Sequence, residues 1–465
     1  MKRGFASTFS LATPLAAALM LAGCGSLVPP VQAPQAALPD SFRPAAAASA
    51  PQAAAHEWDG FFTDARLRQV VGLALADNRT LRASLAAVER LRAQYRVTQA
   101  NRSPELRAST TTGIQGTGGS NVAGLSVSLG ITAWEIDLFD RLGSLEGAAL
   151  SRFEAQQETQ RSARLSLVAE VANAWLTLAA ERQRQQLAED LRASQQRTLA
   201  LTERQYQLGA ASGLQRARAQ TAYEAARGEA ARTAAVAVQA KLALELLTGQ
   251  PLPASLLPGG QIETATPVPD VPGGLPATVL LQRPDLRAAE QALKAAAFDV
   301  GVARAARFPR LTLTASAGQR SSELAGLFDS GNTVWSLLPT LDLALFDAGN
   351  RAAQVQANEA TQRQALAQYE AAVQSAFREV ADALAVRDSL AERLAAQLAQ
   401  VQAAERSLKL VEEGYRLGGS SQLELLDAQR QLSTAQQGWV TLRQTEQSNR
   451  VTLLRALGGR WTAGG

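Results

Sequence analysis

Residues 311–318 read LTLTASAG, so that leucine or alanine alternates with threonine, serine or glycine. This period of two is typical of a β-strand with one apolar face and one polar face. Residues 126–133 (SVSLGITA) alternate in the same way. In both stretches the polar face is small and uncharged, which is unusual for the solvent-facing side of a soluble β-sandwich.

Breaks rich in glycine, serine and asparagine divide each of these regions into two strands. We therefore expect four strands, at about residues 104–115, 122–136, 309–320 and 333–345. A tilted strand of about 9–11 residues is long enough to cross a bilayer in a barrel. Four strands are too few to close a barrel, and open sheet edges are not tolerated in lipid. The pattern thus predicts that several chains share one barrel.

The strand regions belong to a unit that occurs twice. The pattern R-x-P-x-L at residues 102–106 recurs at residues 307–311, and Y-x-L-G at residues 206–209 recurs at residues 415–418. The offsets are 205 residues (307 minus 102) and 209 residues (415 minus 206), so the two copies are nearly collinear. Such a match indicates a tandem duplication. The predicted parts are a first repeat, a connector and a second repeat, at residues 59–250, 251–283 and 284–461.

Each repeat also contains a very long helical segment. Residues 141–208 and 349–417 contain no proline, and a helix of that length extends on the order of 100 Å. Apolar residues such as Val373 and Val380 recur at intervals of seven, which is typical of a coiled coil. Taken alone, this spacing favours a purely structural coiled coil.

The N-terminus reads as a secretory signal. Lys2 and Arg3 precede an apolar stretch that ends in Leu-Ala-Gly-Cys at residues 21–24, a sequence that resembles the bacterial lipobox. This resemblance predicts a lipoprotein signal peptide over residues 1–23 and a lipid on Cys24. Residues 24–58 are rich in proline and alanine, so we expect an extended segment between the lipid and the folded body.

The composition argues against several classes of protein. The chain of 465 residues has a net charge of +4, one cysteine, one histidine (His56) and a mean hydropathy of −0.09. A disulfide or a Cys/His metal cluster cannot form within one such chain. The small charge gives no reason to expect nucleic acid, and no glycine-rich phosphate loop is present. We therefore expect a protein that is not an enzyme, with no cofactor apart from the covalent lipid on Cys24.

Four stretches together identify a family. They read WEIDLFDR at residues 134–141, RPDLRAAE at 283–290, VARAARFP at 302–309 and LDAQR at 426–430. In this order and spacing, the chain resembles the outer membrane efflux proteins, the TolC-like outer membrane factors, and is most similar to their NodT-type lipoprotein branch. The resemblance implies a membrane β-barrel joined to a long α-helical coiled-coil barrel, in which a homotrimer supplies twelve strands and a periplasmic tunnel.

The same resemblance implies a function and partners. Proteins of this family are passive ducts for drugs or other small solutes, loaded by a periplasmic adaptor (a membrane fusion protein) and an inner-membrane pump, here one of the RND class. It also implies a lipid-anchored location in the outer membrane of a Gram-negative bacterium, with the helices reaching into the periplasm.

The family closes its tunnel near the second helix turn, and four residues match that pattern: Tyr415, Leu423, Asp427 and Arg430. Leu423, Asp427 and Arg430 are three or four positions apart, so they share one side of a helix. The alternative is a solvated ion pair worth about 0.5 kcal/mol or less. Gln215 stands where relatives have an aspartate that bonds the tyrosine, which puts that contact in doubt.

Three glycines lie at the helix reversals: Gly209, Gly418 and Gly419. We expect positive φ angles there, and the resemblance makes these turns candidate docking points for the adaptor. Plain helix termination explains the glycines equally well.

Two rival hypotheses remain. The first is a lipid-anchored periplasmic structural or adaptor protein, which has a coiled coil but no barrel. The second is an envelope enzyme that works through carboxylates. Two pairs of amphipathic strands distinguish the duct from an adaptor, because adaptors carry compact soluble β-domains.

Overall fold

The computed structural model describes residues 25–30, 55–56, 58–117, 120–262, 277–459 and 461–462. The chain divides into two compact units. We call residues 86–159 and 285–372, with the N-terminal residues up to 36, the sheet unit; the rest is the helix unit. The predicted signal peptide and Cys24 lie outside the described residues.

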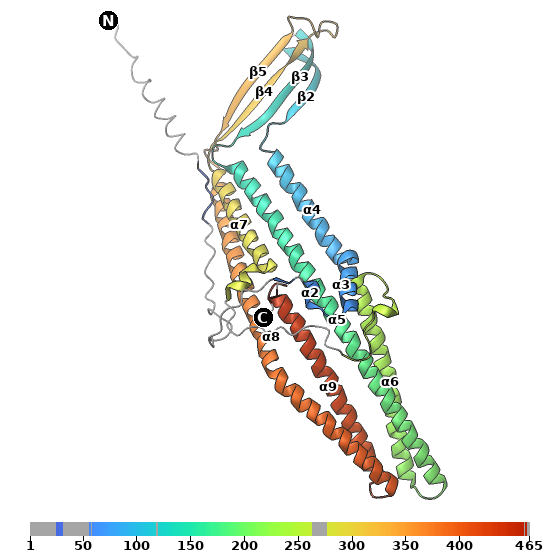
Figure 1. Cartoon of the computed structure of the whole chain (residues 1–465). Helices are drawn as coiled ribbons and strands as arrows, with labels where there is room; N and C mark the ends of the chain where they lie inside the picture. The colour runs from blue at the N-terminus through green and yellow to red at the C-terminus, as the bar shows by residue number, and fades with distance from the viewer. Residues whose placement is uncertain are drawn as a thin grey trace, which may run out of the picture. The chain divides into compact units, whose positions relative to one another are not determined.

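The sheet unit contains one antiparallel sheet with the strand order β2-β3-β4-β5 (Figure 1). The strands are β2 (Leu106–Thr117), β3 (Ser120–Ile136), β4 (Arg310–Ser321) and β5 (Thr333–Asp342). The four strands expected from the alternation are therefore present. The central pair, β3 and β4, joins the two repeats, because Leu129 lies opposite Ala317. A bulge between Ile131 and Trp134 interrupts this pair.

The outer strands of this sheet have little around them. Every residue of β5 is exposed, including Trp335 at 77% and Leu338 at 60% of their side-chain surface. Among the described strands, β2 pairs only with β3, and β5 pairs only with β4. An exposed apolar strand with one free edge is a surface on which another strand or lipid is expected.

Helices make up most of the described chain. The long helices α5 (Arg141–Gln207) and α8 (Asn350–Leu417) have 67 and 68 residues and coincide closely with the proline-free segments. Shorter helices follow each of them, α6 (Gly213–Thr248) and α9 (Gln422–Ala456). The remaining helices are α2 (Trp58–Phe61), α3 (Ala65–Asp77), α4 (Arg79–Ala100) and α7 (Pro284–Ala305), with short 3-10 turns at Ala254–Leu256 and Ala277–Gln282. None of the described helices is long and apolar enough to cross a membrane.

The duplication is also visible in how α6 and α9 end. The buried Asn78 side chain donates to the carbonyl oxygen of Leu247 over 2.8 Å, and it accepts from the backbone N–H of Leu81 at the start of α4. In the second copy, the guanidinium of Arg283 donates to the carbonyl oxygen of Ala456 over 2.8 Å. Arg283 lies 205 residues after Asn78, which is the offset found in the sequence. Asn78 and Arg283 thus bond carbonyl groups at equivalent ends of α6 and α9, the first through a neutral amide and the second through a charged guanidinium.

Arg283 is held more firmly than its counterpart. Its side chain is only 6% exposed, and it also pairs with Glu379 of α8 at 3.0 Å. The Arg-Pro-Asp stretch is therefore structural: Arg283 terminates α9, and Pro284 opens α7 at the position where its missing N–H has no cost.

We expect Asn78→Ala to lower the free energy of unfolding by about 1–2 kcal/mol, because a helix cap and a helix-end contact are lost. Arg283→Ala is expected to cost about 2–3 kcal/mol, since a buried cation that bonds both Ala456 and Glu379 is removed. Arg227→Ala is the matched control, because the Arg227 side chain is 62% exposed and pairs only within α6. Apparent melting temperatures of the detergent-extracted protein rank the stability losses of the three variants. Equal melting temperatures for Arg283→Ala and Arg227→Ala would contradict the structural role of Arg283.

Candidate functional site at the helix ends

Two nearly identical turns reverse the chain within the helix unit. Gly209 follows α5 with a φ of 77°, and Gly418 follows α8 with a φ of 80°. In the second turn, the N–H of Gly418 bonds the carbonyl of Tyr415, and the N–H of Gly419 bonds the carbonyl of Gly414. This is the Schellman arrangement, in which only the first glycine needs a left-handed backbone. The expectation of a positive φ was thus wrong for Gly419.

Each turn is followed by a capping box. At α6, the N–H of Ser212 donates to Gln215 Oε1 over 2.7 Å, and the N–H of Gln215 donates to Ser212 Oγ over 3.2 Å. Ser421 and Glu424 form the same pair of bonds at α9. Gln215 therefore caps the start of its own helix, a position that glutamine suits.

The tyrosine bonds a residue that sequence reasoning missed. The hydroxyl of the half-buried Tyr415 donates to Gln205 Oε1 of α5 over 3.3 Å. Gln205 stands just before the Y-x-L-G pattern of the first copy, but its counterpart in the second copy is Gly414. The duplication therefore gave no signal for it. Tyr415 thus links the end of α8 to the end of α5 through a neutral amide, and Gln215 has no part in this contact.

The other three predicted residues come together along α9. Arg430 donates to Asp427 Oδ1 over 2.5 Å, and Gln431 donates to Asp427 Oδ2 over 2.5 Å. Leu423 is 57% exposed. All three line an open groove of about 500 Å³ between α9, α5 and α6. Its opposite wall is made of small and polar residues, including Ala222, Ala225 and Glu229.

The charges in this groove are compensated locally. The hydrogen bond from Arg430 holds the pKa of Asp427 below its usual value of 3.8. Across the groove, the hydrogen bond from Arg232 lowers the pKa of Glu229. Both carboxylates therefore stay ionised at neutral pH, and each carries its own arginine.

Hydrogen bonds between side chains fasten α9 to α5 along its length. At the turn end, Gln422 donates to Thr202 Oγ1 over 3.0 Å, and both side chains are buried. About two helical turns further along α9, Gln429 accepts a hydrogen bond from Gln195 and donates one to Ser194, each over 3.0 Å. These bonds are directional and mostly shielded from water, so they set the register of the two helices.

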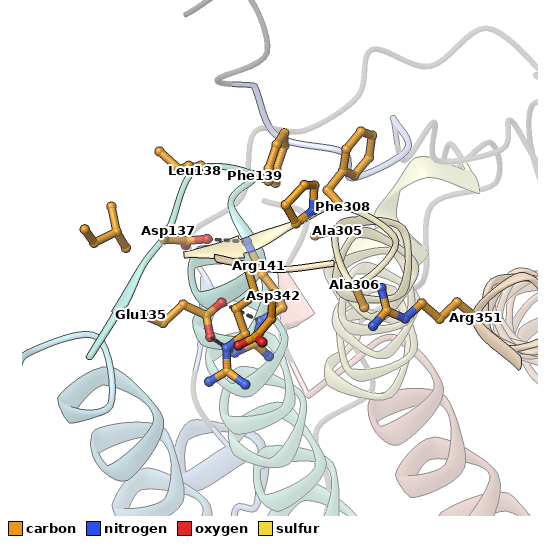
Figure 2. A pocket seen from close by; sticks show the side chains of 13 residues that line it. Glu135, Asp137, Leu138, Phe139, Arg141, Ala305, Ala306, Phe308, Asp342 and Arg351 are labelled. Carbon is orange, nitrogen blue, oxygen red and sulfur yellow. Dashed lines mark hydrogen bonds and ion pairs between the residues drawn. The ribbon is translucent and has the colours of Figure 1, made fainter. Parts of the chain in front are cut away.

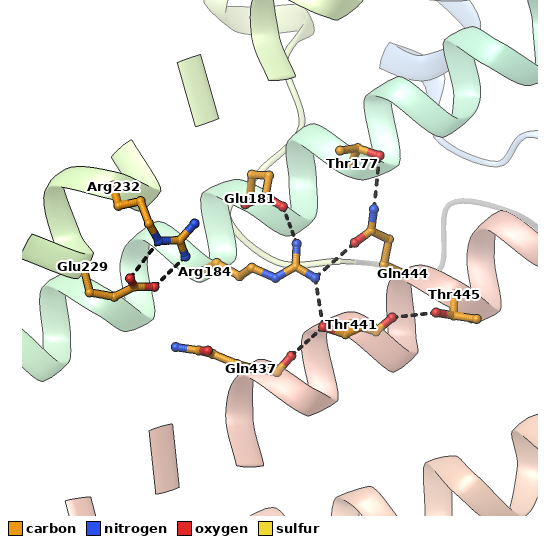
Figure 3. A network of polar contacts seen from close by, with 9 residues as sticks. All are labelled: Thr177, Glu181, Arg184, Glu229, Arg232, Gln437, Thr441, Gln444 and Thr445. Carbon is orange, nitrogen blue, oxygen red and sulfur yellow. Dashed lines mark hydrogen bonds and ion pairs between the residues drawn. The ribbon is translucent and has the colours of Figure 1, made fainter. Parts of the chain in front are cut away.

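The interface continues toward the far end of α9 (Figure 3). Arg184 of α5 donates to Thr441 Oγ1 over 3.0 Å and to Gln444 Oε1 over 3.2 Å. Gln444 in turn donates to Thr177 Oγ1 over 3.1 Å. We call the contacts of Gln422, Gln429, Thr441 and Gln444 with α5 the α5–α9 polar interface.

A second pocket, of about 350 Å³, lies in the sheet unit where strands meet helices (Figure 2). The Glu135 carboxylate, only 8% exposed, receives Arg141 over 2.6 Å and Arg310 over 2.6 Å. Asp137 caps α5 by accepting the N–H groups of Arg141 and Gly143. Phe139 stacks on Phe308 at 4.5 Å between ring centres. The WEIDLFDR stretch thus builds a joint between β3, α5 and β4.

The described residues hold no group of three or more histidine, cysteine, aspartate or glutamate side chains placed to bind a metal ion. Glu135, Glu229 and Asp427 are instead paired with arginines, and Asp137 caps a helix. The helix unit therefore offers an open groove along α9 and the α5–α9 polar interface.

Comparison with known proteins agrees with this arrangement. The sequence model of the family described as "Outer membrane efflux protein" matches residues 70–250 and 275–459, one match for each copy. The chain belongs to this family. Its members are channel proteins rather than enzymes, and the chain is accordingly an outer membrane efflux channel component.

Three relatives illustrate the match. Outer membrane protein OprJ of Pseudomonas aeruginosa is 38% identical, with 96% of this chain and 95% of the relative covered. The toluene efflux pump outer membrane protein TtgC of Pseudomonas putida is 36% identical, with 98% and 96% covered. The probable outer membrane lipoprotein SilC of Salmonella typhimurium is 34% identical, with 95% and 97% covered.

A solved structure extends the likeness to the fold. The outer membrane channel MtrE of Neisseria gonorrhoeae, in its open state, superposes with a TM-score of 0.83 at 35% identity, covering 93% of this chain and 98% of that one. The expected fold class is confirmed: long helices accompany one four-stranded sheet, which is consistent with a chain that contributes to a trimeric barrel. The outer membrane location is likewise that of the family.

The α5–α9 polar interface yields a test by double substitution. Gln429→Ala is expected to lower the free energy of unfolding by about 2 kcal/mol, because Gln195 and Ser194 keep buried polar groups without partners. The double variant Gln195→Leu/Gln429→Leu removes the main pair and should recover part of that loss. Apparent melting temperatures, with Gln431→Ala as an exposed control, measure the cycle. The pairing would be contradicted if the double variant lost more unfolding free energy than the sum of the losses in Gln195→Leu and Gln429→Leu.

Proposed function

We propose that three copies of this chain form a passive duct through which small solutes leave the periplasm across the outer membrane. The observation that carries this proposal is the sheet: four amphipathic strands, with β5 exposed along its whole length and each outer strand paired on one side only. Unpaired strand edges cannot stay in lipid, so the free edges require further strands. Three such sheets supply twelve strands, enough for a closed barrel.

A passive duct needs an external energy source and a connection to it. We propose an inner-membrane pump of the RND class and a periplasmic adaptor as partners, with the turns at Gly209, Gly418 and Gly419 as docking points. Catalysis, nucleic acid and any cofactor other than lipid have no place in this proposal. TtgC is named for toluene, and the cargo of this chain is left open because a wide duct selects weakly.

The proposed anchor is a lipid on Cys24, after removal of residues 1–23. The Leu-Ala-Gly-Cys sequence supports it, and one relative, SilC, is named a lipoprotein.

The proposed gate lies at the helix ends of the helix unit. Leu423, Asp427 and Arg430 line the groove along α9, and Tyr415 ties α8 to α5 through Gln205. Because the same helix side carries an apolar residue and an ion pair, three copies around an axis would narrow the duct. Opening then requires these contacts to separate, a two-state change. Gln215 contributes by holding the neighbouring turn.

We expect Asp427→Ala/Arg430→Ala to raise single-channel conductance several-fold in a planar bilayer, because the ion pair that narrows the duct is lost. The matched control is Arg378→Ala/Asp382→Ala, which removes a more exposed ion pair of α8 that does not line the groove. Large currents from the wild type and both variants would support the duct and contradict the proposed gate. An absence of conductance from folded trimers would overturn the duct itself.

The gate is expected to be insensitive to pH between 8 and 5. The pKa of Asp427 is lowered by Arg430, so the pair contributes fully above the usual value of 3.8 and is lost only as pH falls through the lower value of the folded protein. The ratio of wild-type conductance to that of Asp427→Asn, measured against pH, isolates this pair. A midpoint near pH 6 would contradict the assignment.

A further inference from the structure

The first described residues of the chain pack against two helices of the sheet unit, to which they belong. In residues 25–30, the side chains of Leu27, Val28 and Pro29 are half-buried, whereas Gly25 and Ser26 are exposed. Pro29 and Pro30 restrict the backbone to an extended form. This short segment is therefore seated at particular contacts on helices α5 and α7.

A glycine makes the principal contact possible. A Cβ placed on Gly301 of α7 would lie 2.6 Å from Val28 Cγ2 and 3.3 Å from Val28 Cα. The first distance is shorter than a packed side chain allows, and the second, which is to backbone, is tighter than most Cβ contacts. Gly301 is buried, and its φ is not in the left-handed region, so backbone freedom is not the reason for a glycine. Residue 301 is thus small because Val28 occupies the space.

Neighbouring side chains complete this contact. Ser144 of α5 is 1% exposed, and its Oγ would lie 3.1 Å from the added Cβ. Arg304, one turn further along α7, donates to the carbonyl oxygen of Leu27 over 3.4 Å and to Glu359 Oε1 of α8 over 2.8 Å. A backbone carbonyl and a side chain of the segment are therefore each held by a different residue of α7. We call Ser144, Gly301 and Arg304 the N-terminal seat.

The two helices that form the seat, α5 and α7, are packed tightly against each other. Phe298 of α7 lies over Gly147 of α5 so closely that a Cβ at residue 147 would meet its ring at 2.6 Å. One turn away, Arg152 pairs with Asp299 at 2.5 Å. Helices α5 and α7 thus offer a fixed surface to the segment.

We propose that the N-terminal seat binds Leu27 and Val28 and thereby holds the lipid attachment residue beside the junction of sheet and helices. Val28 is four residues after Cys24, so the chain between them can span no more than about 14 Å. Ser144 lies in the first turn of α5, which begins five residues after β3 ends at Ile136. The acyl chains are therefore confined to the membrane surface next to the periplasmic ends of the strands. The inference rests on the proposed lipid at Cys24, but the seat itself does not.

This seat gives the anchor a mechanical role. A lipid on a long free tether would leave the depth of the sheet undetermined. A lipid held within a few residues of the strand ends positions the sheet relative to the inner surface of the bilayer as the trimer forms.

Limited proteolysis with thermolysin, which cuts before large apolar residues, tests the seat in the purified full-length trimer. In the wild type, cleavage before Leu27 and Val28 is expected to be slow. Gly301→Val should accelerate it at least about tenfold, since such cleavage follows the population of the opened segment. Val28→Ala should accelerate it as well while leaving the helices untouched, which guards against misfolding of the glycine variant. Mass spectrometry of the released N-terminal peptide gives the rate and shows the acyl group.

Two controls separate the possible failures. Gly228→Val places the same side chain on a helix glycine with open space around it and should leave the cleavage rate at the wild-type value. Cys24→Ser should keep the protection, because the seat contacts only Leu27 and Val28. Wild-type cleavage as fast as in Gly301→Val, or loss of protection in Cys24→Ser, would overturn the seat. A peptide without an acyl group would overturn the lipid but not the seat.

Discussion

The unpaired edges of a four-stranded sheet are the constraint on which the rest of this molecule depends. A strand edge presents a row of N–H and C=O groups, and lipid cannot bond them. Here, the described β2 and β5 each have one neighbour, and β5 is exposed on both faces. A water-soluble sheet would cover such an edge with charge or with a helix. This sheet instead keeps a run of apolar residues there, which is why we interpret it as one third of a closed structure.

The duplication supplies a scaffold with two similar halves, and function lies where the halves differ. Both turns use a Schellman glycine and a capping box. Yet one cap carries the neutral Gln215 and the other the charged Glu424, and Asn78 is replaced by Arg283 at the equivalent helix end. The second copy also holds the groove-lining ion pair of Asp427 and Arg430. In the gate that we propose, the helices of the second copy line the groove, and the α5–α9 polar interface ties α9 to α5 of the first copy.

Much of the fold could be predicted from the sequence, because it is encoded by local periodicities. Alternation fixes the strands, and the absence of proline over residues 141–208 and 349–417 fixes the long helices. The partner of Tyr415 could not be predicted, since Gln205 is 210 residues away and only the folded chain brings the ends of α5 and α8 together. Gly419 was misjudged because dipeptide composition does not tell which glycine of a pair takes the positive φ. The seat for Val28 was missed for the same reason as Gln205: a small residue in a helix does not reveal what fills the space beside it.

The central claim, that three chains complete one sheet, is tested most directly by native mass spectrometry of the detergent-extracted protein. The account predicts a particle of three chains that persists until the strands unfold, with no folded monomer at low concentration. A folded monomer with its strand content intact would contradict it, because the edges of β2 and β5 would then be stable without a neighbour.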